Sequence, residues 1–139
     1  MQTVHYQHEF PYTYDSRGEL FPMLQLAVSN PFDPTPVVEM EAYLDCGAQR
    51  SLFDGSLARM VGIDLMTGRR LRFSTAAGLP IEAIAHPLRI SHPDVGQFEF
   101  DVGLTTMPLR RNLLGRDFFN LVQIGFRERH SLFYVTPRP

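Results

Sequence analysis

The sequence predicts a mainly β domain, a barrel or folded sheet with one or two short helices, and three observations predict this class. Short apolar segments with strand-like character recur along the chain, turn-forming residues separate them, and only two brief stretches have helical spacing. The chain of 139 residues has the length of one domain. A domain of this size buries roughly 68–70% of the surface of its unfolded chain, so it needs no covalent staple.

Strands are predicted where apolar residues run for several positions between turn signals. In the clearest of them, Phe98, Phe100 and Val102 alternate with acidic residues, as on a half-buried strand. Three prolines and two Asx residues at 30–36 predict a turn or loop, and 75–80 is expected to be a hairpin tip. The predicted strands are 20–28, 37–44, 70–74, 81–90 and 97–104.

Two stretches favour short helices. Asp54 is placed to cap the first helix, whose apolar face has Leu57, Met60 and Val61. Gly62 can end this helix, because glycine adopts the left-handed conformation of a helix C-terminus. The remaining predicted elements are a second helix at 113–121 and a closing hairpin, whose strands are 122–126 and 132–135.

A faint internal symmetry runs through the chain. Strands that lead to Leu44-Asp-Cys-Gly and a helix are echoed by strands that lead to Leu113-Leu-Gly and a helix. Residues 1–19 are polar and aromatic, and we expect them to be an arm, partly disordered or packed on a partner subunit. The domain itself is expected to span residues 20–139.

Composition and charge exclude several classes of function. Hydrophobic residues make up 44% of the chain and the formal net charge is −2, which favours neither a nucleic-acid nor a membrane partner. Arg69-Arg70 and Arg110-Arg111 are therefore interpreted as solvated loop charges. One cysteine suits a reducing compartment. No signal-like N-terminus and no apolar stretch of about 18–20 residues is present, so we expect a cytoplasmic location.

One local pattern combines a strand, a turn and a reactive group. Asp45 directly follows an apolar strand, and Cys46, Gly47 and Ala48 continue the chain as small residues. Such a turn holds a carboxylate at the edge of a rigid sheet, where functional residues are common. Taken alone, the pattern is equally compatible with an aspartate that only opens an Asx turn.

With the rest of the chain beside it, this pattern resembles the retropepsin-like aspartic proteases, the single-domain retroviral proteases and their cellular and bacterial relatives. That family has an apolar strand ending in Asp-Thr/Ser-Gly-Ala/Ser, then a flap hairpin with glycine, and late in the chain two apolar residues and glycine, often followed by Arg-Asp. The matching motifs, in the same order, are Leu44-Asp45-Cys46-Gly47-Ala48, Ala76-Ala77-Gly78-Leu79 and Leu113-Leu114-Gly115-Arg116-Asp117. The resemblance covers roughly residues 20 to 135.

The resemblance implies a homodimeric endopeptidase, which we expect to come from a bacterium. The Asp45 of each subunit would face the other across the two-fold axis. Two carboxylates about 3 Å apart share one proton. The ionised carboxylate then takes a proton from a water, and the protonated one donates to the scissile carbonyl of a peptide or unfolded protein. No metal or cofactor is required, and an identical subunit is expected to supply the second aspartate.

The resemblance also implies roles for the neighbouring residues. Main-chain groups of the active-site turn and a flap tip that closes over the extended substrate would bind the peptide. The expected substrate-binding residues are Gly47, Ala48, Ala77, Gly78 and Leu79. The residues expected to support the active-site loop are Cys46, Leu113, Leu114, Gly115 and Arg116.

Two departures from the family pattern affect these expectations. Cys46 replaces a hydroxyl that braces the two turns across the dimer axis, and a thiol is a weaker donor. The alternative function is therefore a catalytically weak or inactive retropepsin-fold module for dimerisation or peptide binding. Gln49 replaces an acidic residue that pairs with the late arginine in many members, so Arg116 is expected to pair with Asp117 or a main-chain carbonyl.

Other chemistries have weaker support in the sequence. His5 and His8 lack the nearby cysteines or carboxylates of a zinc site, so no metal site is predicted. A cysteine hydrolase at Cys46 is disfavoured because the adjacent carboxylate opposes formation of a thiolate. The acidic residues of the strands alternate as a solvated face would, and they do not form the carboxylate pair of a glycosidase.

Overall fold

The computed structural model describes residues 1–75 and 77–137, in which strands predominate and the helices are short. The strands are β1 (His8–Pro11), β2 (Thr13–Tyr14), β3 (Leu20–Phe21), β4 (Met23–Asn30), β5 (Asp33–Leu44), β6 (Leu52–Phe53), β7 (Arg69–Ser74), β8 (Pro80–His92), β9 (Gly96–Thr105), β10 (Leu113–Leu114), β11 (Val122–Arg127) and β12 (Leu132–Pro137). The helices are α1 (Leu57–Met60), α2 (Arg116–Phe119), and the 3-10 turns η1 (Leu65–Thr67) and η2 (Glu128–His130). The predicted mainly β class is confirmed.

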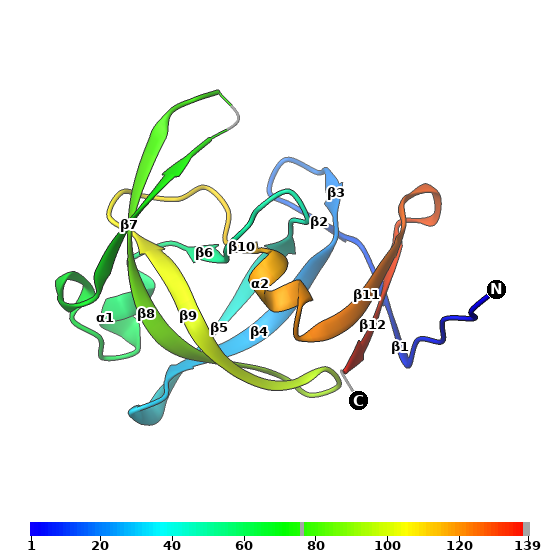
Figure 1. Ribbon diagram of the computed structural model, residues 1–139, viewed down its shortest axis with the longest axis horizontal. Coiled ribbons are helices and arrows are strands. Elements are labelled where there is room, and N and C mark those ends of the chain that lie inside the picture. Colours follow the sequence, from blue (N-terminus) through cyan, green and yellow to red (C-terminus); the bar gives the residue numbers. More distant parts are fainter. Residues whose placement is uncertain (76, 138–139) are drawn as a thin grey trace.

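Seven strands form the main sheet, in the order β4-β5-β10-β6-β9-β8-β7. An additional pairing of β4 with β8 closes this sheet into a barrel (Figure 1). The barrel interior is apolar because alternate residues of each strand point inward, as Leu24, Leu26 and Val28 do on β4. Full burial of each such side chain stabilises the fold by roughly 1.5–3 kcal/mol.

The two short strands of the barrel cross between its halves. β10 lies parallel to the end of β5, with Leu113 opposite Tyr43, and β6 lies parallel to the end of β9, with Leu52 opposite Gly103. β10 and β6 also pair with each other in antiparallel orientation. The chain segments that follow β5 and β9 are therefore held side by side at one end of the barrel.

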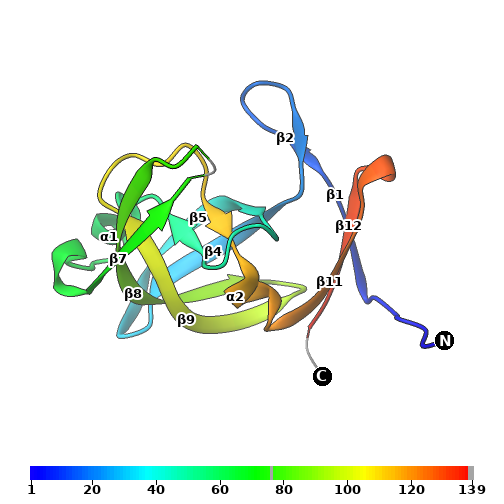
Figure 2. The ribbon, with the colours of Figure 1, turned by 45° about the horizontal axis from the view of Figure 1, so that its top comes forward.

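A second sheet of three strands, in the order β1-β12-β11, stands beside the barrel (Figure 2). Phe10 of β1 stacks on buried Phe133 of β12, with 5.2 Å between the ring centroids, and the Tyr12 hydroxyl donates to Glu128 at 2.6 Å. This corrects part of the arm prediction, because residues 8–14 pair within their own chain (Figure 1). The domain boundary at residue 20 stays a prediction.

The predicted loop at 30–36 is wrong in its extent. Only residues 31–32 form the turn, and β5 begins at Asp33. The register of β4 and β5 shifts between Ser29 and Asn30, so the residues opposite the shift are not all paired. Proline is tolerated at such an irregularity because a residue outside the ladder needs no N–H donor.

Two details of the predicted helices are also corrected. Met60 is 55% exposed, and Ala58 occupies the buried face of α1 with Leu57 and Val61 instead. Gly62 has φ +73° and ends this helix as predicted. The second helix is shorter than 113–121, because residues 113–114 are inserted as a strand between β5 and β6. Long-range pairing outweighs the local helical spacing there.

Candidate active site

Asp45 lies on a turn whose start is fixed by the neighbouring strand. Its N–H donates to the carbonyl of Leu114 on β10 at 2.9 Å, and the N–H of Ala48 donates to the carbonyl of Asp45 at 3.2 Å. One carboxylate oxygen, Oδ1, accepts from the Gly47 N–H at 2.9 Å. The aspartate thus opens an Asx turn, and the same hydrogen bond fixes the direction of a half-buried carboxylate.

A groove of about 850 Å³ runs over this turn and under the β7–β8 hairpin. Its walls are the Asp45 turn, the facing residues of β7 and β8, and the segment 109–113 before β10. Asp45 belongs to the wall that the turn forms, while Phe73 and Ile81 belong to the wall formed by the hairpin that projects from the barrel (Figure 1). Of the three predicted motifs, the Asp45 turn and the late motif, through Leu113, line this one groove.

Main-chain groups of the turn differ in their availability to a ligand. Both groups of Ala48 are engaged within the chain, because its N–H donates to Asp45 and its carbonyl accepts from the Arg116 N–H at 2.8 Å. The Gly47 N–H is occupied by the Asp45 carboxylate. The roles of Gly47 and Ala48 in substrate binding stay predictions.

The tip of the hairpin is a tight turn beyond the groove. The Gly78 N–H donates to the Thr75 carbonyl at 2.9 Å, and Gly78 has φ +79°, which favours glycine. Leu79 is 64% exposed, and neither it nor Gly78 or Ala77 lines the groove of the single chain. Ala76 of the predicted flap motif lies outside the described residues.

Ser51 and Asp117 anchor the turn from below. Asp117 Oδ2 accepts from the Ser51 N–H at 2.9 Å, and its Oδ1 accepts from the Ser51 hydroxyl at 2.7 Å. The Ser51 oxygen in turn accepts from the Gly115 N–H at 3.0 Å. Sequence reasoning missed Ser51, and its only signal is a hydroxyl directly before the apolar pair of β6.

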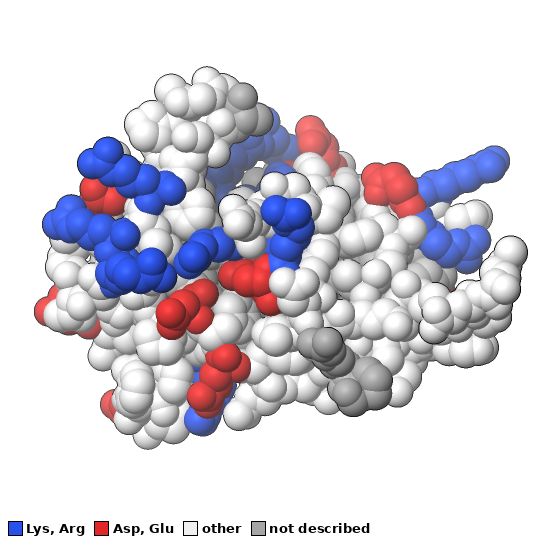
Figure 3. Space-filling model, viewed as in Figure 1, with Lys and Arg blue, Asp and Glu red and all other residues white. Residues whose placement is uncertain are grey.

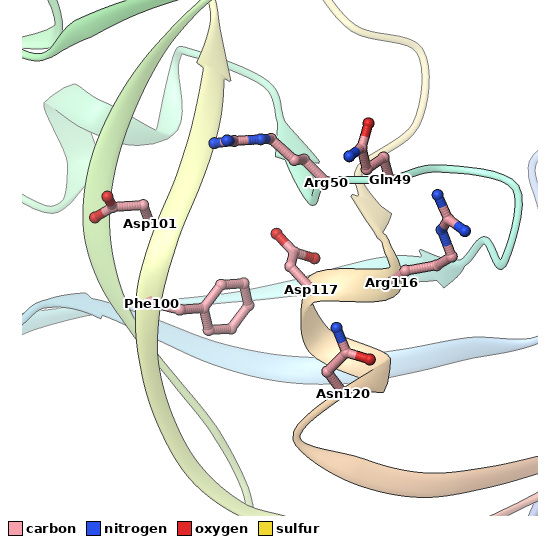
Figure 4. A pocket seen from close by; sticks show the side chains of 7 residues that line it. All are labelled: Gln49, Arg50, Phe100, Asp101, Arg116, Asp117 and Asn120. Carbon is pink, nitrogen blue, oxygen red and sulfur yellow. The ribbon is translucent and has the colours of Figure 1, made fainter.

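Arg116 does not pair as predicted. Figure 4 shows its side chain pointing away from Asp117, which points from the start of α2 toward the segment of Arg50. Within residues 1–75 and 77–137 the Arg116 guanidinium forms no ion pair, and the Asp117 oxygens accept from Ser51 instead. The residue contacts the turn through its main-chain N–H instead.

Gly115 is the tightest point of the late motif. A Cβ atom at this position would lie 2.7 Å from the carbonyl oxygens of Ala48 and Arg50. Real Cβ atoms do not approach backbone this closely, so only glycine fits. Leu114 is fully buried beneath the turn and accepts the Asp45 N–H with its carbonyl.

An arginine that sequence reasoning placed in a solvated loop forms one end of the groove. The Arg111 guanidinium lies 3.9 Å from the centroid of the Phe21 ring and 3.2 Å from Asp15. It also lies over the ring of Tyr43, whose pKa is raised by burial and by the negative charge of Asp45. The solvated-loop interpretation is therefore wrong for Arg111, whose side chain is 26% exposed.

Two of the histidines have structural contacts. His86 is buried, with Nε2 2.7 Å from the Leu65 carbonyl, and the ring of His92 lies edge-on to Phe10. In the part of the chain that the structure describes, no three His, Cys, Asp or Glu side chains gather as a metal ligand set. Nor does any helix there have the length and apolar character of a membrane-crossing segment.

Comparison with known proteins agrees with this geometry. The aspartyl protease family model matches residues 35–118, more than half of the chain, which include the Asp45 turn and the Leu113–Asp117 motif. No curated protein matches the sequence. The chain is similar to the crystal structure of a retropepsin-like aspartic protease from Rickettsia conorii, with a TM-score of 0.63 and 17% identity over 98% of this chain and 100% of that chain.

A second solved structure shares the fold. EIAV protease complexed with the inhibitor HBY-793 is similar with a TM-score of 0.53 and 19% identity, over 78% of this chain and 91% of that chain. At such identities the solved structures establish the fold, and the family model establishes the family. The chain therefore belongs to the aspartyl protease family and has the retropepsin-like fold.

Proposed function

We propose that the protein is an aspartic endopeptidase, in which the Asp45 carboxylates of two identical subunits activate one water. The observation that carries this proposal is the place of Asp45, at the end of β5 on the wall of a groove of about 850 Å³ beneath a hairpin. Such a groove suits an extended peptide, because the sheet holds the Asp45 turn on one side and the β7–β8 hairpin covers the other.

The chemistry needs both carboxylates in different protonation states. When two such groups approach within about 3 Å, they hold one proton between them. The ionised group removes a proton from the bound water, whose oxygen attacks the scissile carbonyl carbon, and the protonated group donates to the carbonyl oxygen. The tetrahedral intermediate collapses when the carboxyl that took the proton from water donates it to the leaving amine nitrogen and the other carboxylate takes a proton back from a hydroxyl of the intermediate. The C–N bond breaks, and the pair again holds one proton.

One chain supplies only one of these carboxylates. The segment 106–112, which follows β9 as the Asp45 turn follows β5, has no aspartate or glutamate. The second carboxylate in this mechanism therefore comes from the Asp45 of an identical subunit, related by a two-fold axis. The hairpin tips at 77–79, which are exposed in the single chain, would close over the peptide from both subunits.

The decisive experiment is cleavage of an unfolded protein and a mixed peptide library by the Asp45→Asn variant, between pH 3 and 7. We expect a loss of roughly a thousandfold or more in kcat/KM, because the amide neither removes the proton from water nor shares one. Asp33→Asn, an exposed aspartate at the start of the same strand, is the matched control and retains activity. Sedimentation should show dimers for both variants. Cleavage by Asp45→Asn at the wild-type rate contradicts the mechanism.

One observation favours a second function, the weak or inactive module. The Cys46 side chain is exposed, and in the described residues it forms no hydrogen bond. The brace that a hydroxyl provides between the two turns is therefore weaker. If the wild-type protein binds extended peptides without cleaving them, and Cys46→Thr creates turnover, the protein functions as a binding module.

A further inference from the structure

The groove around Asp45 is lined by many more positive than negative side chains. Four arginines reach it, and Asp45 is the one carboxylate in its described lining. The arginines are Arg50, Arg72, Arg110 and Arg111, which come from the active-site turn, from β7 and from the segment before β10. Figure 3 shows blue side chains within the hollow beside the β7–β8 hairpin. This local excess contrasts with the formal net charge of −2 of the whole chain.

Among the residues that the structure describes, one of the four arginines forms an ion pair. Arg111 pairs with Asp15 at 3.2 Å. Within the described ranges, Arg50, Arg72 and Arg110 have no ion pair within 4 Å. The charge of Arg110 also acts on Asp15 from a longer distance, so Arg50 and Arg72 are the arginines of the groove with the least compensation.

The nearest acidic side chains are engaged elsewhere or face a different cavity. Glu82 lies opposite Arg72 in the hairpin register and lines a second cavity of about 430 Å³ with it, but the ion pair of Glu82 is with Arg70, at 3.4 Å. Asp101 and Asp117 line an adjacent cavity of about 490 Å³ together with Arg50 (Figure 4), and Ser51 holds both oxygens of Asp117. Neither cavity neighbour forms an ion pair with Arg50.

We infer that the groove selects peptides with aspartate or glutamate side chains close to the scissile bond, an inference that rests on the proposed protease function. A guanidinium binds a carboxylate with two parallel, charge-assisted hydrogen bonds, and these strengthen when the hairpins exclude water. A lysine or arginine in the same place is repelled by the charges of the groove. Apolar side chains of the substrate have Phe73, Ile81 and Leu109 as neighbours in the same groove.

The two-fold symmetry of the proposed dimer makes the selection bilateral. An isologous interface presents the same residues of each subunit to opposite ends of the peptide. Arg72 and Arg110 of one subunit would contact residues before the scissile bond, and the same residues of the other subunit would contact those after it. The expected substrate thus has an apolar centre with an acidic residue on each side.

The test compares two peptides that differ only in charge, with an apolar scissile pair flanked on both sides by glutamate or by glutamine. At neutral pH and low salt we expect the glutamate peptide to have a kcat/KM roughly tenfold higher or more, the size of one good charge-assisted hydrogen bond. This ratio should fall with added salt and should also fall toward one as pH drops below about 4, where glutamate is protonated.

Variants separate a binding role from a structural one. Arg72→Gln and Arg110→Gln should each lower the glutamate-to-glutamine ratio, and the double variant should bring it close to one. Arg129→Gln is the control, because Arg129 is exposed on η2 and outside the groove. Arg72→Glu should reverse the selection toward lysine-flanked peptides, an effect that loss of structure does not produce.

The outcomes distinguish this inference from the function on which it rests. Equal cleavage of the two peptides overturns the charge selection and leaves the protease function in place. Absence of cleavage for both peptides, together with no cleavage of the unfolded protein and the peptide library, contradicts the protease function, and the selection is then measured by binding of the labelled peptides to the Asp45→Asn variant. Equal dissociation constants for the glutamate and glutamine peptides in that measurement overturn the inference.

Discussion

The two halves of the barrel have the same plan, but only the first has a carboxylate directly after its long strand. In the first half, β5 leads through a turn to the short strand β6 and the helix α1. In the second half, β9 leads through the segment 106–112 to the short strand β10 and the helix α2. Each short strand lies parallel to the long strand of the other half, β10 against β5 and β6 against β9.

The anchoring of the two halves is reciprocal. The Gly55 N–H, before α1, donates to the Thr105 hydroxyl of the second half at 3.2 Å. The Gly115 N–H, before α2, donates to the Ser51 hydroxyl of the first half at 3.0 Å. Both hydroxyl residues are buried, so each half fixes the turn of the other from inside the protein.

The difference lies in what the anchored turns present. Asp45 directly follows β5, whereas β9 ends at Thr105 and continues as Thr-Met-Pro. The chain thus has this arrangement of long strand, connecting segment, short strand and helix twice. A carboxylate directly after the long strand is present only in the first half, as Asp45. In the proposed mechanism the second subunit therefore supplies a chemical group, because the barrel of the single chain is already held together by its own contacts.

Replacing Gly55 and Gly115 tests whether each half of the barrel anchors the other, and it should have the largest effect on the free energy of unfolding. A Cβ at Gly55 would collide with the Thr105 carbonyl, and a Cβ at Gly115 with the carbonyls of Ala48 and Arg50. We expect Gly55→Ala and Gly115→Ala each to lower the free energy of unfolding by roughly 3 kcal/mol or more, because backbone must move.

Urea denaturation of the two glycine variants measures this effect. Gly18→Ala is the matched control, because Gly18 has φ +78° but nothing within 4 Å of a new Cβ. Its loss should be only about 1 kcal/mol, from the conformation alone. Variants at Gly55 and Gly115 that are as stable as the control would show that the two halves are not held by close backbone contact.

Replacing the carboxylates close to these glycines should have a smaller effect on the free energy of unfolding. Asp117 accepts three hydrogen bonds, two from Ser51 and one from the Phe118 N–H at 2.8 Å. Asp117→Asn leaves donors facing an amide nitrogen, so the free energy of unfolding should fall by about 1–3 kcal/mol. Asp33→Asn, at an exposed position, should be neutral in the same thermal or urea unfolding assay. An unchanged stability for Asp117→Asn would mean that Ser51 alone anchors the turn.

Asp54 makes the corresponding contact in the first half, and its effect depends on pH. Hydrogen bonds from Ser56 and from the Leu109 N–H lower the pKa of Asp54 below its usual value of 3.8. Because the folded-state pKa is the lower one, the stabilisation is complete well above pH 3.8 and is lost as pH falls through the folded pKa. The free energy of unfolding of Asp54→Asn should therefore fall less steeply than that of the wild type between pH 5 and 2.

Unfolding curves at several pH values check this prediction. Some acid dependence should remain in the variant, because the pKa of Asp15 is also lowered, chiefly by the main-chain N–H of Glu19. Parallel pH profiles for wild type and Asp54→Asn would mean that neither the Ser56 nor the Leu109 hydrogen bond lowers the pKa of Asp54 in solution. This would remove one of the contacts between the halves.

The sequence predicts the local parts of this arrangement well. Alternation and turn residues locate the strand before Asp45, the hairpin around 75–80 and the hairpin at the end of the chain. Asp45 itself is found because it stands where a strand pattern stops and small residues begin. Each of these signals is contained within about ten residues, so no knowledge of the remote chain is needed.

The crossing of the halves is what local signals do not contain. The predicted symmetry matched Leu113-Leu-Gly with the Asp45 turn, whereas the structure pairs residues 113–114 with β5 and β6 as a strand. Likewise, Ser51 and Asp117 are 66 positions apart, and Arg111 and Asp15 are 96 apart. Neither pair has a sequence signal of its own, because the two residues become neighbours only when strands that are distant in the sequence come together in the fold.

The smallest predicted effect concerns the residue that follows the aspartate. Cys46 is exposed and, in the described part of the chain, unbonded, whereas a threonine hydroxyl at this position could donate across the axis of the proposed dimer. We expect Cys46→Thr to lower the dimer dissociation constant a few-fold, the effect of one exposed or partly exposed hydrogen bond. Sedimentation of both proteins over a dilution series measures this, with Cys46→Ala as the control that lacks any donor. If Cys46→Thr and Cys46→Ala dissociate at the same concentration, the residue after Asp45 has no part in holding the two turns together, and their alignment depends on the β10 and Ser51 contacts alone.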